Sequence, residues 1–237
     1  SRPGSSSDSR TAARTEPPRK RDPLLRKTDP PTTIRPHPGY AIPWRLRRAF
    51  LLEWPHAAMP RTQYIFIDYE NVHEKDLSRI EGRSAVVHLV LGARQQSPPK
   101  ELHRQMESLA EKAELIRTPL AAKNSLDFVL TCEVGMRAAR DPHGYFHIIS
   151  RDKGYDVVVK HLKELGIFAA RRDSLREVPA LMTTEERLEL LLKHLEKPGT
   201  PRPRKRRTLA STIQSFFERA LTDQVVEKTI GYLVHKD

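Results

Sequence analysis

Four aspartates lie next to the ends of apolar segments, where their carboxylates could hold a divalent metal ion. Asp68 closes the apolar segment 64–68, and a buried aspartate is costly unless it is paired or binds a metal. Asp152 and Asp156 follow a second apolar segment, and Asp127 lies near the start of a predicted helix. Clustered carboxylates suit Mg²⁺ or Mn²⁺, which keep several waters and bridge to substrate phosphates. The four residues therefore predict a metal site.

These aspartates also have ordinary structural explanations. Asp152 could cap the helix that follows it, and Asn124 with Asp127 forms a common capping arrangement. Asp68 is a poorer cap, because Asn71 is better placed to start the next element. In an open parallel sheet, ligands bind outside the carboxyl ends of the strands. Three acidic segments at that edge therefore indicate a site more strongly than any one of them alone.

A metal ion held at this edge could support hydrolysis of a phosphodiester, because it lowers the pKa of a bound water and neutralises charge on the scissile phosphate. The net charge agrees with such a substrate. Lys and Arg total 42 against 30 acidic residues, which gives a net charge of +12 and a pI near 10.0. This balance favours a polyanionic partner, of which nucleic acid fits best. Residues 1–58 and 202–207 carry much of the charge, so the charge alone does not identify the partner.

The cysteine and histidine content argues against a zinc site. Cys132 is the single cysteine, which excludes an internal disulfide and a Cys-rich zinc site. Its apolar neighbours predict a place in the core. His88 and His147 fall inside apolar strand patterns, and we expect both to be packing residues. Oxygen ligands are therefore favoured over nitrogen and sulfur.

The segments that must position the aspartates alternate between short apolar runs and longer runs with helical spacing. This alternation is typical of an α/β domain in which helices cover a mostly parallel sheet. The last helix is expected to start near Thr184. The pattern predicts strands at 64–68, 85–91, 115–117, 145–150 and 167–170, and helices at 99–112, 125–139, 155–165 and after residue 183.

The chain length suits one such domain with appendages. We expect residues 1–58 to be a disordered, basic, Pro-rich extension, within which residues 40–56 could form a short amphipathic helix. The α/β domain should occupy 59–180, followed by a helix and basic linker at 181–207 and a small helical module at 208–237. That module could bind nucleic acid, form part of a winged helix, pack as an appendage or make a dimer contact.

Residues 64–175 resemble the PIN-like nucleases, and in particular the NYN branch of that fold. The resemblance is carried by Asp68-x-x-Asn71, by the segment 123–127, in which an acid begins a helix, and by the closing segment 150–156. It implies a compact three-layer sandwich and a Mg²⁺ or Mn²⁺ site. For most members it also implies hydrolysis of RNA.

The resemblance makes Asp68, Asp127, Asp152 and Asp156 the catalytic residues, as ligands of the metal or of its waters. Many members of the branch separate the last two acids by one residue, whereas this chain separates them by three. Asp156 is therefore expected to contact the metal either directly or through a water. A further group is expected to orient the site or bind phosphate, and comprises Asn71, Lys123, Ser150, Arg151 and Lys153.

Two other functions fit part of the pattern. A phosphatase of the haloacid-dehalogenase type also places a nucleophilic Asp after its first strand, but it needs an Asp two residues later, where this chain has Glu70. A non-catalytic RNA-binding protein would use the basic segments and leave the acidic site inert. We expect a cytoplasmic protein without a membrane partner, because no apolar run approaches the roughly 20 residues of a spanning helix. A homodimer or a larger complex is possible.

Overall fold

The structure is a computed structural model that describes residues 61–95 and 97–234, without the side chain of Val234. Predictions for residues 1–60, including the disordered extension and the helix at 40–56, lie outside the described residues. The described residues belong to one compact unit. Among its helices, none is both long and apolar enough to cross a membrane.

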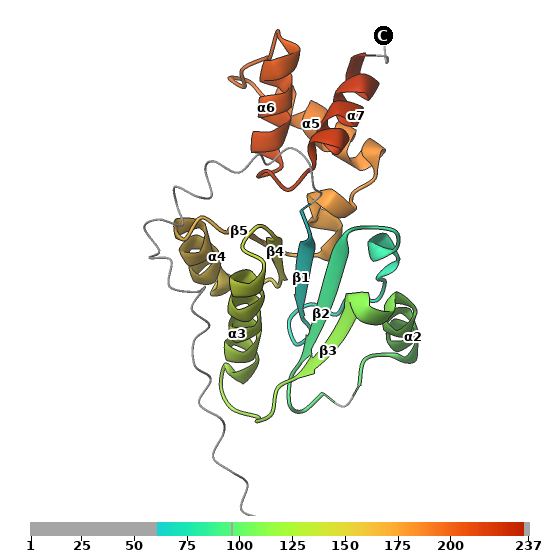
Figure 1. Ribbon diagram of the computed structural model, residues 1–237, viewed down its shortest axis with the longest axis vertical. Helices are drawn as coiled ribbons and strands as arrows, with labels where there is room; N and C mark the ends of the chain where they lie inside the picture. The colour runs from blue at the N-terminus through green and yellow to red at the C-terminus, as the bar shows by residue number, and fades with distance from the viewer. Residues whose placement is uncertain (1–60, 96, 235–237) are drawn as a thin grey trace, which may run out of the picture. The chain divides into compact units, whose positions relative to one another are not determined.

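The domain alternates strands and helices in the order that the sequence predicts (Figure 1). Each predicted strand and helix is present, with ends that shift by a few residues. The strands are β1 (Gln63–Asp68), β2 (Ala85–Leu91), β3 (Ala113–Arg117), β4 (Tyr145–Ile149) and β5 (Phe168–Arg172). The helices are α2 (Lys100–Leu109), α3 (Ser125–Arg140), α4 (Tyr155–Glu164), α5 (Thr184–Leu195), α6 (Arg206–Phe216) and α7 (Asp223–Val234), with short 3-10 turns at Ser78–Ile80, Ala110–Lys112, Leu175–Glu177 and Pro179–Leu181.

The five strands form one sheet in the order β3-β2-β1-β4-β5, and every neighbouring pair is parallel. From β1 the chain adds β2 and β3 on one side, and then crosses back to add β4 and β5 on the other. The carboxyl ends of β1 and β4 therefore flank the switch point of the topology, where open α/β sheets bind their ligands. The predicted α/β class is confirmed.

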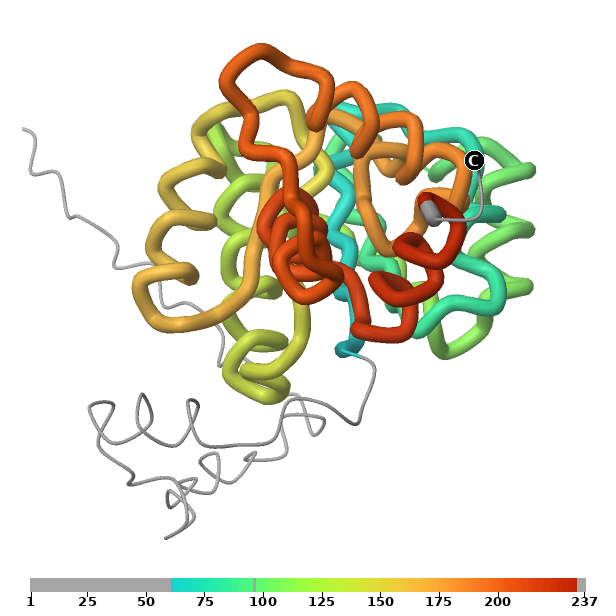
Figure 2. Tube along the Cα trace, turned by 90° about the horizontal axis from the view of Figure 1, so that it is seen from above, coloured from blue at the N-terminus to red at the C-terminus, as the bar shows by residue number. Residues whose placement is uncertain are grey.

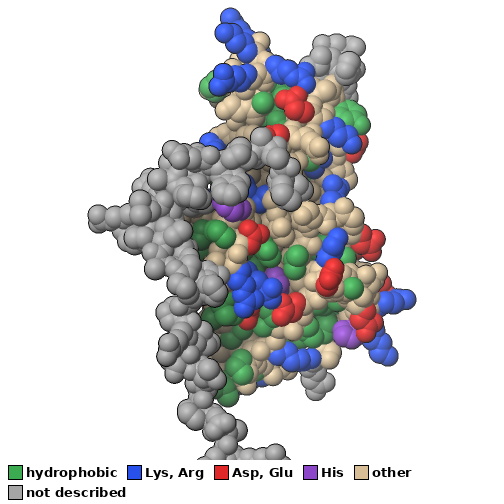
Figure 3. Space-filling view, viewed as in Figure 1, with side chains coloured by type: hydrophobic (Ala, Val, Ile, Leu, Met, Phe, Trp, Pro, Cys, Tyr) green, Lys and Arg blue, Asp and Glu red, His purple; other side chains and the backbone are tan. Residues whose placement is uncertain are grey.

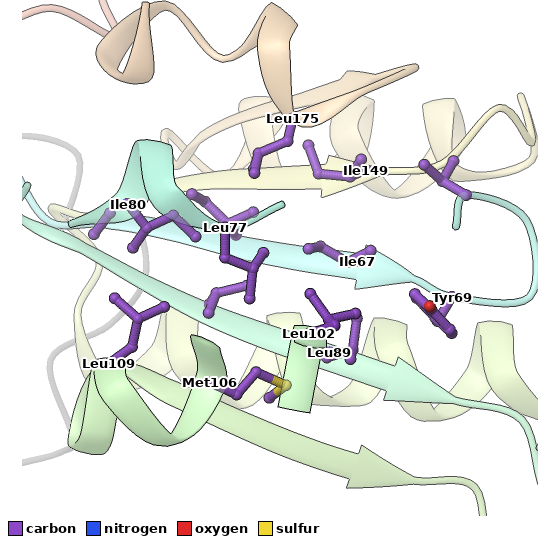
Figure 4. Packing of buried hydrophobic residues seen from close by; sticks show 14 of the residues in the cluster. Ile67, Tyr69, Leu77, Ile80, Leu89, Leu102, Met106, Leu109, Ile149 and Leu175 are labelled. Carbon is purple, nitrogen blue, oxygen red and sulfur yellow. The ribbon is translucent and has the colours of Figure 1, made fainter. Parts of the chain in front are cut away.

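Helices cover both faces of the sheet, which makes three layers. Figure 2 shows α3 and α4 on one side of β1 and α2 on the other. Alternate residues of β1 supply the two cores: Ile65 and Ile67 pack with Leu102 and Met106 of α2, whereas Phe66 packs with α3 and α4. Figure 4 shows the first of these cores from close by. Each buried aliphatic side chain stabilises the fold by about 1.5–3 kcal/mol, which holds the carboxyl ends of the strands in place.

The prediction that Cys132 lies in the core is wrong, because its side chain is exposed. The buried stripe of α3 consists of Leu126, Leu130, Val134 and Ala138, at spacings of four residues. Cys132 lies between two of these positions and so falls on the opposite face of the helix. The predicted packing roles of the two strand histidines are confirmed, since both are fully buried.

The three C-terminal helices share a hydrophobic cluster of their own. Leu191 of α5 packs with Ile213 of α6 and with Val226 and Ile230 of α7. The helix α5 begins at the expected residue, Thr184, with Thr183 as its N-cap in a capping box with Glu186. The sequence placed α5 with the basic linker, whereas its contacts join it to the helical module. These helices are bonded to the sheet domain, as described below.

Candidate metal centre

A cleft of about 510 Å³ opens at the carboxyl end of β1. Four carboxylates line it: Asp68 at the end of β1, Glu70 two residues later, Asp127 in the first turn of α3 and Asp152 after β4. Three separate chain segments therefore bring acidic side chains to one place. The parallel topology explains this, because it directs the ends of β1 and β4 and the start of α3 to the same edge.

Asp68 is the buried member of the set, with only 3% of its surface exposed. Its Oδ2 accepts a hydrogen bond of 2.9 Å from the Ser150 hydroxyl, and its Oδ1 accepts one of 3.2 Å from the Asn71 amide. Burial raises the pKa of Asp68, these hydrogen bonds oppose the rise, and the charges of Asp127 and Glu70 add to it. A nearby cation would favour the ionised form of this carboxyl group.

Ser150 and Asn71 tie the loop after β1 to the loop after β4. The Asp152 amide donates to the Ser150 hydroxyl oxygen at 3.1 Å, while that hydroxyl donates to Asp68. The Asn71 side-chain oxygen accepts from the Arg151 amide at 3.0 Å. Asn71 is exposed and lines the cleft, whereas Ser150 is fully buried. They fix the carboxylates relative to one another, as supporting residues around metal ligands commonly do.

Asp127 is held by a residue that the sequence analysis did not single out. The Tyr155 hydroxyl at the start of α4 donates to Asp127 Oδ1 at 2.7 Å. Burial raises the pKa of Tyr155, and the neighbouring carboxylates raise it further, so the hydroxyl keeps its proton and remains a donor. Among the described residues, no backbone group donates to the Asp127 carboxylate, so the capping explanation for Asp127 finds no support in the geometry. Asn124 caps without a side-chain bond, in a left-handed conformation with φ 59°.

Asp152 and Asp156 differ in what they contact. Asp152 accepts from the Gly154 amide at 2.7 Å, the local turn that its position before a helix suggested, and it still lines the cleft. Asp156 is not among the residues that line the cleft. Its Oδ1 instead accepts from Arg171 Nε on β5 at 2.8 Å. Because three residues separate the two acids, Asp156 falls in the first turn of α4. There it is close to Arg171 of β5.

The end of the Glu70 side chain lies against Gly92. A Cβ at Gly92, just after β2, would overlap the Glu70 carboxylate, so this side chain occupies the space that only glycine leaves free. The sequence indicates Glu70 only as a reserve ligand of the metal and favours a solvated surface acid at this position. Its role at the rim of the cleft depends on the end of the neighbouring strand, which no local pattern around Glu70 reveals.

The basic residues near the carboxylates fall into two groups. Lys123 and Arg94 line the cleft, and both are exposed. Arg151 and Lys153 are exposed as well but do not line it. Arg94 lies in the loop after β2 and was not predicted. Its only signal in the sequence is its position just beyond a strand that ends at the same sheet edge as Asp68.

The donor chemistry of the cleft fits a hard divalent cation. None of the ion pairs between described residues includes Asp68, Asp127 or Asp152. As they lie, no three acidic, histidine or cysteine side chains in the described part of the chain are close enough to coordinate one ion together. An ion in this cleft would therefore bind partly through water, in the manner that Mg²⁺ prefers.

The fold and the cleft define a three-layer α/β domain with an acidic site at its switch point. Residues 62–172 match the family model of the PIN domain, which supports a PIN-like nuclease domain in this part of the chain. The match spans every strand of the sheet and all the carboxylates of the cleft, and it ends before the C-terminal helices. It does not single out the NYN branch, which stays a prediction. No curated protein and no solved structure gives a significant match to the chain.

Proposed function

We propose that the chain is a metal-dependent endoribonuclease that cleaves RNA at the cleft. The observation that carries this proposal is a set of three carboxylates, Asp68, Asp127 and Asp152, which three segments bring to the switch point of the sheet. None of the three has an ion-pair partner among the described residues. PIN domains are nucleases as a family, and they usually use divalent metal ions. The net charge of +12 supports a nucleic-acid substrate.

Mg²⁺ or Mn²⁺ bound here would supply an activated water and neutralise charge on the scissile phosphate. Asp68, Asp127 and Asp152 would hold the ion, directly or through its waters, and Glu70 is the fourth carboxylate that the cleft offers. Asp156 was expected in that role, but its bond to Arg171 engages it outside the cleft. We therefore assign Asp156 to the stability of the β4–α4 turn.

The remaining cleft residues position the substrate and the carboxylates. Lys123 and Arg94 carry positive charge at the rim and would bind phosphates on either side of the scissile bond. Ser150 orients Asp68, and Tyr155 orients Asp127. Fixed donors and acceptors of this kind lower the cost of reorganisation when charge develops on the phosphate.

The test is cleavage of labelled single-stranded RNA, structured RNA and single-stranded DNA by the full chain with Mn²⁺, Mg²⁺ or EDTA. Asp68→Asn removes a cleft carboxylate, and Asp156→Asn is a matched control that makes the same chemical change outside the cleft. We expect Asp68→Asn to lower the rate by at least about 100-fold and Asp156→Asn to lower it by less than about 3-fold. Equal effects of the two changes would contradict the assignment of the site.

A non-catalytic RNA-binding protein is the second candidate. It is favoured by the spacing of the acids, since no three of the described acidic side chains are close enough to share an ion as they lie. This candidate predicts RNA binding that is sensitive to salt, without cleavage under any metal condition. The same assay therefore separates the two functions.

A further inference from the structure

A short basic segment precedes α6, outside the part of the chain that matches the PIN domain. We call residues 202–207 the basic segment, and five of the six are Arg or Lys. All five are exposed. Arg206 pairs with Glu227 of α7. In the described part of the chain, the structure gives no ion pair or side-chain hydrogen bond to the other four, which are Arg202, Arg204, Lys205 and Arg207.

The four bases contrast with cations of the sheet domain, which pair with acidic residues of the C-terminal helices. Arg172 and Lys163 both pair with Glu218, and Arg79 pairs with Glu186. The first turn of α6 contains no acidic residue. Positive charge at the start of a helix is disfavoured by the helix dipole, so an anionic partner would relieve the repulsion. The positive charge of the basic segment therefore does little to stabilise the fold, and it is suited to binding an external polyanion.

The basic segment is a better nucleic-acid contact than the last helix. In the helix-turn-helix arrangement, the second helix of the pair reads the groove, which here would be α7. The exposed residues of α7 include Asp223, Glu227 and Lys228, a mixture with more negative than positive charge. Figure 3 shows Lys and Arg side chains gathered over α6 and the segment before it. Contacts from this segment would be made to phosphates rather than to bases.

The C-terminal helices are bonded near the end of β1 that lies opposite the cleft. Arg61, two residues before β1, donates to the Arg219 carbonyl at 3.0 Å in the turn between α6 and α7. Asp68 ends the same strand. The basic segment lies at the other end of α6, whose 11 residues span about 16 Å, and the six residues of β1 span about 20 Å more. A nucleic acid that reaches from the basic segment to the cleft therefore covers roughly ten nucleotides.

We propose that the basic segment binds the phosphate backbone of the single-stranded RNA whose scissile bond lies in the cleft. This inference rests on the proposed function, and it adds a second contact that depends on substrate length. Long substrates engage both sites and gain affinity from the second, whereas short substrates engage the cleft alone. The segment thereby makes the enzyme selective for length without taking part in the reaction.

The experiment measures binding of labelled RNA of about 20 nucleotides to the full chain in EDTA, by fluorescence anisotropy over a series of salt concentrations. The test variant changes Arg202, Arg204, Lys205 and Arg207 to Gln. The control variant changes four exposed bases of the PIN-like domain to Gln, with the same loss of charge: Lys75, Arg83, Lys100 and Arg176.

We expect the test variant to reduce the slope of log K against log salt by about 3, because single strands contribute about 0.7 for each phosphate contact. The control should reduce it by less than about 1. Equal reductions would overturn the proposal, because they would show that only net charge matters. A test variant that binds RNA normally but loses binding to vesicles containing phosphatidylserine would overturn it in favour of an anionic membrane.

Cleavage distinguishes failure of this inference from failure of the proposed function. With Mn²⁺, the test variant should cleave a substrate of about 5 nucleotides at the rate of the unmodified chain, and should show a raised KM only for the longer RNA. Equal KM values for the long RNA would contradict the basic-segment contact and leave the cleft assignment intact. If neither the test variant nor the unmodified chain cleaves RNA, but the two still differ in RNA binding, the nuclease proposal is wrong and the basic-segment contact is retained.

Discussion

The two ends of β1 differ in whether the charged side chains around them are paired. At its amino end, Arg61 lies over the ring of Phe168 and donates to a carbonyl, and Glu218 accepts from both Lys163 and Arg172. At its carboxyl end, carboxylates share a cleft without ion-pair partners among the described residues. Pairing at one end stabilises the fold, and the missing pairing at the other leaves charge for a ligand. This contrast separates structural from functional acids better than their spacing in the sequence does.

Acid should destabilise the fold through its buried histidines, which is the largest effect that we expect on stability. His147 bonds to Gln63 at 2.9 Å, and burial lowers its pKa to about 3, with the charge of Arg172 lowering it further. Because this pKa lies below the value of the unfolded chain, His147 contributes its full stability above pH 6.5 and loses it as the pH falls toward 3. By pH 4.5 the loss should reach about 2–3 kcal/mol.

Urea denaturation at pH 7 and at pH 4.5 checks this prediction, with His147→Gln as the comparison. The fall in the free energy of unfolding between the two pH values should be smaller in the variant by about 2–3 kcal/mol. An unchanged fall would show that the imidazole accepts a proton inside the fold. His88, whose pKa burial also lowers, to about 4, acts in the same direction and remains in both proteins.

A smaller effect is expected at the carboxyl end from Tyr155→Phe, which keeps the ring and removes the donor to Asp127. Loss of a supporting hydrogen bond of this kind lowers metal affinity by about 10-fold. Titration with Mn²⁺, followed by electron paramagnetic resonance, measures it directly. A role confined to packing would lower the stability and leave the Mn²⁺ affinity unchanged.

The smallest effect is expected from Gly92→Ala, which displaces Glu70 without removing it. The new methyl group would occupy the place of the Glu70 carboxylate, a flexible group that can move away. Mn²⁺ affinity should fall by about 3-fold if Glu70 contributes to the ion or its waters. Gly135→Ala is the matched control, because a Cβ there meets no atom within 4 Å. Similar affinities in both variants would exclude Glu70 from the site.

The sequence predicted the sheet because its central strands, β1, β2 and β4, are nearly continuous apolar runs, which two-sided burial requires. It also predicted that acids following β1, β3 and β4 would converge, because parallel topology directs their ends to one edge. The partners of those acids were not predictable from local patterns. Arg171 reaches Asp156 from β5, and Tyr155 reaches Asp127 from another helix. Such contacts are set by packing, which the spacing of residues along the chain does not specify.

The central claim is that the cleft carboxylates, and not Asp156, hold a divalent ion. Its most direct test is the binding of Mn²⁺ to the full chain, measured by calorimetry or electron paramagnetic resonance, beside Asp68→Asn and Asp156→Asn. We predict that Asp68→Asn weakens binding by at least about 10-fold and that Asp156→Asn leaves it within about 2-fold. Unchanged binding in Asp68→Asn, or an equal loss in both variants, would contradict the claim.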